Sequence, residues 1–79
     1  MNNIEKYQNA FAEAFDVKPD QMAELKYQGI SEWDSIGHMT LIALLEEAFD
    51  VMLDTDDIID FSSYQKGMEI LKKYEIAFD

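Results

Sequence analysis

The sequence contains no cysteine and no arginine, and both absences restrict what the protein can do. Without cysteine there is no disulfide framework, no thiolate metal site and no cysteine nucleophile, so any thiol chemistry must come from an attached group. The six basic residues are all lysines, which lack the forked side chain that phosphate-gripping sites commonly use. No apolar run is long enough to cross a bilayer, and no N-terminal signal pattern is present, so we expect a cytoplasmic protein.

Positive charge is scarce, because seventeen acidic residues stand against six lysines and give a formal net charge of −11 at pH 7. Nucleic acids and anionic membrane surfaces would be repelled by this charge, so neither is expected as a partner. A partner protein with a basic surface is favoured instead. With 79 residues, of which 48% are hydrophobic, residues 1–79 are expected to form one small globular domain and to be monomeric.

Hydrophobic periodicity predicts an all-α fold: a small bundle of three principal helices and one short helix, with a long loop between the first and second helices. The first helix is expected over residues 3–15, with an asparagine cap at Asn2 or Asn3. The loop over 16–33 should contain one helical turn that opens at Pro19, because proline is tolerated at the first helical position. Four apolar side chains should pack this loop against the core: Leu25, Tyr27, Ile30 and Trp33.

The second principal helix is expected to begin at Asp34 or Ser35. Asp34 is a favourable N-cap residue, because its carboxylate can accept a hydrogen bond from the first turn. Ser35 then occupies the first helical position, where free N–H groups and the helix dipole would stabilise an anion attached to its oxygen. The alternative is that Asp34 and Ser35 serve only as capping residues.

Both sides of this second helix carry apolar residues. The side expected to face the core contains Leu41, Ile42, Leu45, Ala48 and Phe49. The opposite side contains Ile36, Met39 and Ala43, with Thr40 and Glu47 beside them. A helix with apolar residues on its outer side is either buried twice or presents a docking surface, and docking is favoured in so short a chain.

The acidic stretch over 54–60 predicts a short capped helix with Ile58 and Phe61 turned inward. Two interpretations stay open for its acids, which include Asp56 and Asp57. They belong either to a solvated face or to a surface that binds a partner.

Neither a metal site nor a catalytic site is expected. An EF-hand loop starting at Asp50 or Asp54 would lack the required glycine and glutamate. Asp34, Ser35 and His38 lie within five residues, but two of them are adjacent at a helix start and no oxyanion pocket is evident. We expect His38 to pack at the helix start.

The last helix is expected to begin at Ser62, whose spacing to Gln65 fits a capping box. Gly67 lies inside this helix, where it costs about 1 kcal/mol relative to alanine. Such a cost suggests a close helix approach or room for an attached chain. Residues 76–79 are expected to be a frayed end.

The second helix contains two further motifs, the tripeptide Asp34-Ser35-Ile36 at its start and the run Leu45-Glu46-Glu47-Ala48-Phe49-Asp50 at its end. The first resembles the Asp-Ser-Leu attachment motif of acyl carrier proteins, and the second resembles the Leu-Glu-Glu-x-Phe ending of their second helix. The resemblance extends from about Ile4 to Tyr74. The resemblance implies that Ser35 carries 4'-phosphopantetheine, added from coenzyme A by a Mg-dependent phosphopantetheinyl transferase. An acyl or aminoacyl group would then be carried as a thioester, and the protein itself would not be an enzyme.

By the same resemblance, acyl-loading and acyl-transfer enzymes with basic docking surfaces would recognise the second helix and the acidic stretch. The residues implied in this contact are Ile36, Met39, Ala43, Glu46, Glu47, Asp56 and Asp57. Small residues near Gly67 would help to open a cleft for cargo, and Trp33 could line the path of the arm instead of packing in the core.

The sequence departs from fatty-acid-synthesis carriers at four positions: Trp33, Gly37, Thr40 and Ala43. These departures favour a dedicated carrier of a bacterial biosynthetic cluster, such as one for a surface polysaccharide or a secondary metabolite. A different class of function also fits the pattern, namely an unmodified acidic helical module that binds a basic partner. Replacing Ser35 by alanine would abolish function in the carrier and leave the interaction module unaffected.

Overall fold

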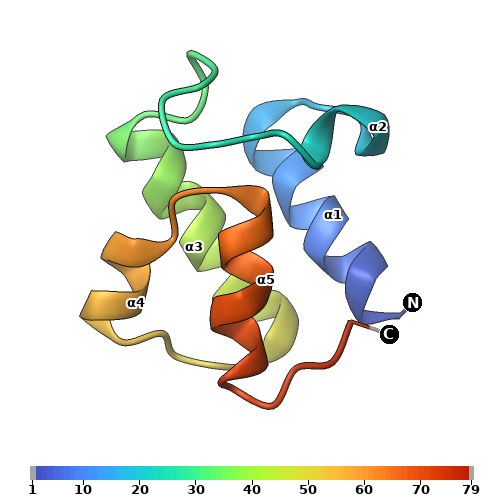
Figure 1. The fold of residues 1–79 in the computed structure, drawn as a ribbon, viewed down its shortest axis with the longest axis vertical. Helices are drawn as coiled ribbons and strands as arrows, with labels where there is room; N and C mark the ends of the chain where they lie inside the picture. Colours follow the sequence, from blue (N-terminus) through green and yellow to red (C-terminus); the bar gives the residue numbers. More distant parts are fainter. Residues whose placement is uncertain (1, 79) are drawn as a thin grey trace.

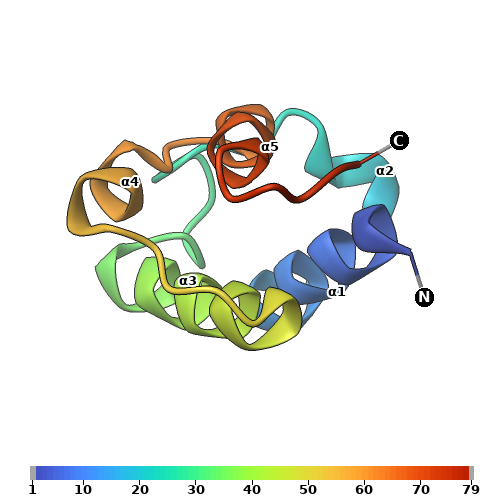
Figure 2. The same ribbon diagram turned by 90° about the horizontal axis from the view of Figure 1, so that it is seen from below.

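Five helices surround one hydrophobic core in the computed structural model, which describes residues 2–78 (Figure 1). The helices are α1 (Asn3–Phe15), α2 (Pro19–Met22), α3 (Ser35–Phe49), α4 (Thr55–Asp60) and α5 (Tyr64–Lys72). Helices α1, α3 and α5 are the three principal ones, and α4 is short, so the predicted small all-α bundle is confirmed. Figure 2 shows α1 and α3 along one side of the molecule, with α4 and α5 across from them.

Helix α1 has the predicted bounds because both of its ends are specified locally. The Asn2 side chain accepts a hydrogen bond from the Glu5 N–H at 2.9 Å, and the Glu5 side chain accepts one from the Asn2 N–H, which completes a capping box. The helix ends where Asp16 takes a left-handed conformation with φ of 56°. The predicted helical turn at Pro19 is also present, as α2.

The core is rich in aromatic rings, and α1 contributes three of them from one face. Tyr7, Phe11 and Phe15 are buried on this face, and Trp33 lies among them. The Trp33 ring contacts Phe11 edge-on at 5.5 Å and stacks on Phe15 at 5.1 Å between ring centroids. Trp33 is completely buried, so the prediction that it packs in the core is confirmed, against the alternative that it lines the path of an attached arm. The rest of the buried core is formed mainly by Leu41, Ile42, Leu45, Phe61, Ile70 and Leu71.

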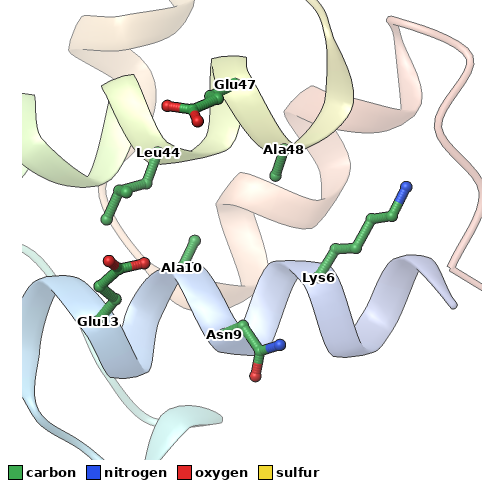
Figure 3. Close-up of a pocket in the computed structure, with 7 residues that line it drawn as sticks. All are labelled: Lys6, Asn9, Ala10, Glu13, Leu44, Glu47 and Ala48. Carbon is green, nitrogen blue, oxygen red and sulfur yellow. The ribbon is translucent and has the colours of Figure 1, made fainter. Parts of the chain in front are cut away.

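Helices α1 and α3 pack together through small and aliphatic side chains. Ala10, Leu44 and Ala48 point into the space between the two helices in Figure 3. Lys6, Glu13 and Glu47 surround the remaining hollow of about 250 Å³. Alanine at two of these positions lets the two backbones approach, which fixes α3 on the core.

The long loop before α3 is packed down, as predicted, and two backbone hydrogen bonds tie it to the segment before α5. The Tyr27 N–H donates to the Ser62 carbonyl at 2.8 Å, and the Tyr64 N–H donates to the Leu25 carbonyl at 3.0 Å. Lys26 and Ser63 face each other as an antiparallel bridge between these bonds. The Leu25 side chain is buried, and those of Tyr27 and Ile30 pack against the core.

The predicted start of the last helix is wrong by one capping residue. Ser63, not Ser62, is the N-cap of α5, and its side chain accepts a hydrogen bond from the Lys66 N–H at 3.0 Å. The pairing with the loop explains the shift, because it holds this segment extended up to Ser63. The expected partner Gln65 donates instead to the Ala23 carbonyl at 3.4 Å.

The expectation of a frayed C-terminal end is wrong for residues 76–78. Ile76 is buried, and the Phe78 ring lies 5.2 Å from the ring of Tyr7. The Asn3 side-chain amide donates to the Ala77 carbonyl at 2.8 Å, which brings the two chain ends together (Figure 1). Apolar residues therefore anchor this segment across the start of α1, and Asp79 lies outside the described residues.

Gly67 lies where α5 packs closely against the rings of Phe61 and Tyr7. A Cβ atom at this position would lie 2.2 Å from the Phe61 Cζ atom and 2.2 Å from the Tyr7 hydroxyl oxygen. The predicted close approach is therefore confirmed, and two rings fill the space that was considered for an attached chain.

None of the helices within residues 2–78 is long and apolar enough to span a membrane.

Candidate modification site at the start of α3

Ser35 is exposed at the first position of α3, as predicted. Asp34 precedes it in an extended conformation, and its Oδ1 accepts a hydrogen bond from the Gly37 N–H at 2.8 Å. Asp34 is therefore the N-cap of a helix of fifteen residues. The N–H groups of Ser35 and Ile36 precede the first intrahelical bond, which His38 makes to Asp34. The site combines an exposed hydroxyl with the positive end of a helix dipole.

The loop before Ser35 folds directly onto the first turn of α3, which requires glycine at position 37. A Cβ atom at Gly37 would lie 1.9 Å from the Glu32 carbonyl oxygen and 3.2 Å from the Phe15 ring. Any other residue would push the loop away from the helix. Gly37 is thus explained by the path of the loop, which sequence reasoning did not anticipate.

Tyr27 contacts Ser35 from the loop and is the site residue that sequence reasoning missed. Its hydroxyl oxygen lies 3.2 Å from Ser35 Oγ, and either hydroxyl can donate. From the sequence, Tyr27 was predicted only to pack the loop against the core. No local pattern indicates a contact between two residues that lie eight positions apart across a loop. The backbone pairing with Ser62 brings the two hydroxyls together.

His38 is buried in the first turn of α3, three residues after Ser35, and both of its ring nitrogens are hydrogen-bonded. Trp33 Nε1 donates to His38 Nδ1 at 2.9 Å, and the indole N–H can only donate, so Nδ1 is the unprotonated nitrogen. His38 Nε2 then carries the proton and donates it to the Ile58 carbonyl at 2.8 Å. The imidazole therefore links the loop and α3 to α4, and neither nitrogen is bonded to Ser35. The prediction that His38 packs at the helix start is confirmed.

An apolar pocket of about 370 Å³ opens beside Ser35, between α3 and α4. Its lining includes Tyr27, Ser35, His38, Met39, Ile58 and Ile59. Such a volume lies at the lower end of the range of small-molecule sites. Phe61, which is 1% exposed, also lines this pocket.

Apolar side chains surround this site on the outside of the molecule. Ile36 is 79% exposed and Met39 is 53% exposed on α3, and Ile59 is 72% exposed on α4. Ala43 is also exposed, one turn further along α3. The outward placement predicted for Ile36, Met39 and Ala43 is confirmed, and Ile59 adds an apolar residue that the sequence did not single out.

The acids implied in partner binding fall into two groups. Glu47 and Asp56 are exposed. Glu46 is half-buried and accepts a hydrogen bond from the Leu53 N–H at 2.9 Å, so it also holds the chain after α3. Glu47 and Asp56 are therefore the acids of this set whose carboxylates are fully available to a partner.

Asp57 does not belong to the exposed acidic surface, which corrects both interpretations of this residue. It is only 7% exposed, and its carboxylate accepts hydrogen bonds from Lys73 Nζ and the Tyr74 hydroxyl, each at 2.5 Å. Hydrogen bonding to Lys73 and then to Tyr74 lowers the pKa of the Asp57 carboxyl below its ordinary value. Asp57 therefore ties α4 to the end of α5, an arrangement that local sequence does not reveal.

Comparison with known protein families, curated proteins and solved structures gives no match for this chain. Within the described part of the chain, no three His, Cys, Asp or Glu side chains are grouped so as to hold a metal ion.

Proposed function

We propose that this protein is a carrier whose Ser35 holds 4'-phosphopantetheine through a phosphodiester. When bound, this group supplies the thiol that carries an acyl or aminoacyl cargo as a thioester. The observation that carries the proposal is the Ser35 hydroxyl, exposed at the first position of α3 and beside an apolar pocket. The lack of cysteine in the chain agrees with an attached source of thiol.

The residues at the start of α3 fit a phosphodiester. Its negative charge would lie at the positive end of a fifteen-residue helix, near the N–H groups of Ser35 and Ile36. Asp34 Oδ1 is bonded to the Gly37 N–H, so this cap leaves the N–H groups of Ser35 and Ile36 to the phosphodiester. The chain therefore supplies an attachment oxygen, backbone donors and a rigid helix start.

Attachment would form a bond between Ser35 Oγ and the phosphorus that bears the pantetheine of coenzyme A. The diphosphate bond of coenzyme A would break, adenosine 3',5'-bisphosphate would leave, and the hydroxyl proton would pass to a base of the Mg-dependent transferase. Both nitrogens of His38 are occupied within the fold, so the transferase supplies that base. This reaction takes place where coenzyme A is available, which favours the cytoplasm.

The surface around Ser35 suits enzymes that load and transfer the cargo. Ile36, Met39 and Ile59 would supply apolar contact area, and Glu47 and Asp56 would attract a basic docking surface. Tethering raises the effective concentration of the cargo at each docked enzyme without any bond chemistry by the carrier. We place the protein in a dedicated biosynthetic pathway rather than in general fatty-acid synthesis.

The test is intact-protein mass spectrometry after incubation with coenzyme A, Mg and a broad-specificity phosphopantetheinyl transferase. The wild type should gain one phosphopantetheine, and Ser35→Ala should gain none. Ser62→Ala is the matched control, because Ser62 is also exposed and close to the pocket, and this variant should be loaded like the wild type. Unmodified wild-type protein would contradict the carrier proposal.

A second candidate function is an unmodified module that binds a basic protein partner. The observation in its favour is the exposure of Ile36 and Met39, which needs no modification of Ser35 to form a docking surface. Under this alternative the wild type would gain no mass, and Ser35→Ala would retain full partner binding.

A further inference from the structure

We propose that Tyr27 is the positioning residue of this site: its phenol orients the Ser35 hydroxyl before the arm is attached and donates a hydrogen bond to the phosphodiester afterwards. The proposal rests on the proposed function of Ser35. It assigns a role to a residue outside the helix and outside the Asp-Ser motif.

The backbone around Tyr27 fixes the position of its ring. The Tyr27 N–H donates to the Ser62 carbonyl at 2.8 Å, and the neighbouring Gln28 N–H donates to the Trp33 carbonyl at 2.9 Å. Gln28 takes a left-handed conformation with φ of 64°, which turns the chain directly after Tyr27. The backbone on either side of the Tyr27 side chain is therefore held in place, by one hydrogen bond to the segment before α5 and by another to the segment before α3.

The side chain itself is held by a residue that is immobilised in turn. The Tyr27 ring meets the His38 ring edge-on, with 5.4 Å between centroids. His38 is fixed by its hydrogen bonds to Trp33 and Ile58. The phenol thus reaches Ser35 from a rigid support, and both residues line the pocket.

The chemistry of the contact changes when the arm is attached. Before attachment, either the Tyr27 or the Ser35 hydroxyl can donate in the 3.2 Å contact. After attachment the Ser35 oxygen carries no hydrogen, so only the phenol can donate, to the ester oxygen or to a charged phosphate oxygen. Hydrogen bonds to an ionised acceptor are stronger than neutral ones, so the contact should become stronger in the loaded protein. The chain has no arginine to bind the phosphate, so a phenol is a suitable hydrogen-bond donor at this site.

The experiment compares the wild type with Tyr27→Phe, which removes only the hydroxyl. Tyr64→Phe is the matched control, because its hydroxyl accepts a hydrogen bond from Gln8 rather than contacting Ser35. Three readouts are taken: the Hα–Hβ couplings of Ser35 in the unmodified protein, kcat/KM for loading by the transferase, and the phosphorus-31 resonance of the loaded protein. Helical circular dichroism confirms that each variant is folded.

We expect Ser35 to show the couplings of one rotamer in the wild type and in Tyr64→Phe, and averaged couplings in Tyr27→Phe. Loading of Tyr27→Phe should be about fivefold slower in kcat/KM, the factor that corresponds to one ordinary hydrogen bond. Its phosphorus-31 resonance should be displaced from that of the wild type, whereas the Tyr64→Phe resonance should not move.

Two results would separate failure of this proposal from failure of the proposed function. If the wild type is loaded, but Tyr27→Phe matches it in couplings, rate and phosphorus-31 resonance, the role of Tyr27 is overturned and the carrier function stands. Averaged Ser35 couplings in the wild type would overturn the orienting role without any variant. If the wild type accepts no arm, the proposed function fails, and the bond from Tyr27 to a phosphodiester fails with it.

Discussion

Gly67→Ala is the perturbation whose effect the structure determines most directly. In an exposed helix interior this change would stabilise the fold by about 1 kcal/mol, because alanine has the higher helix propensity. At Gly67 the added Cβ would instead lie 2.2 Å from both Phe61 Cζ and the Tyr7 hydroxyl oxygen. Both are parts of rigid rings that are at most 1% exposed, so neither can move into solvent.

The magnitude follows from three contributions. Overpacking against rigid core groups costs about 3 kcal/mol at the upper end of the usual range. Displacing Tyr7 also strains its buried hydrogen bond to the Tyr64 carbonyl, which is 2.6 Å long, and losing such a bond costs about 1 kcal/mol. Subtracting the propensity gain of about 1 kcal/mol leaves a net destabilisation of about 3 kcal/mol. For a domain of this size that corresponds to a melting temperature lower by about 12–24 °C.

The assay is urea and thermal unfolding of Gly67→Ala beside the wild type. Glu69→Ala and Glu69→Gly form the matched pair, because Glu69 is exposed within the same helix and their difference gives the local glycine-to-alanine propensity. Gly67→Ala should be less stable than the wild type, although Glu69→Ala should be more stable than Glu69→Gly. If Gly67→Ala is as stable as the wild type or more stable, the close approach of α5 to Phe61 and Tyr7 is refuted.

Two further predictions concern the acids of α3 and α4. Hydrogen bonds from Lys73 and Tyr74 lower the pKa of Asp57 from 3.8, so its stabilising contribution is complete above pH 3.8 and is lost as the pH falls through the lowered pKa. Asp57→Asn should therefore reduce the free energy of unfolding at neutral pH more than at a pH below the lowered pKa of Asp57, as measured by urea denaturation, and an equal reduction at both would contradict the ion pair. For the proposed docking surface, the double variant Glu47→Gln/Asp56→Asn should lower kcat/KM for loading at low salt, and added salt should reduce the difference. Glu24→Gln is the control for an exposed acid in the segment after α2, and loading equal to wild type in the double variant would assign the docking surface elsewhere.

Helices whose ends are encoded by adjacent residues could be predicted from the sequence. Asn2 caps α1 and Asp34 caps α3 through side chains that bond the first turn, so both helices begin where local chemistry places them. Helix α5 begins one residue later than predicted, because the segment before it pairs with residues far away in the chain. The packed end over residues 76–78 was missed for a similar reason, since Ala77 and Phe78 contact Asn3 and Tyr7 at the opposite end of the sequence.

The candidate site divides in the same way. Ser35 and its cap are adjacent in sequence, and their placement at the start of α3 was predicted. The contact of Tyr27 with Ser35 depends on a loop that folds back, and the bond from His38 to Ile58 joins two helices across the pocket. The environment of Asp57 could not be predicted from composition alone, because the lysine and the tyrosine that donate hydrogen bonds to its carboxylate lie sixteen and seventeen residues away.

The departures from fatty-acid-synthesis carriers carry unequal weight once the fold is known. Trp33 is buried in the core and donates a hydrogen bond to His38, and both contacts hold the end of the loop against α3. The carbonyl of Glu32, the residue before Trp33, then leaves space only for glycine at position 37. Trp33 and Gly37 are thus two parts of one packing arrangement and say little about cargo. Thr40 and Ala43 remain exposed on the outer side of α3, where no packing requirement excludes an acid or a methionine. The proposal of a dedicated set of partner enzymes therefore depends on these two exposed positions.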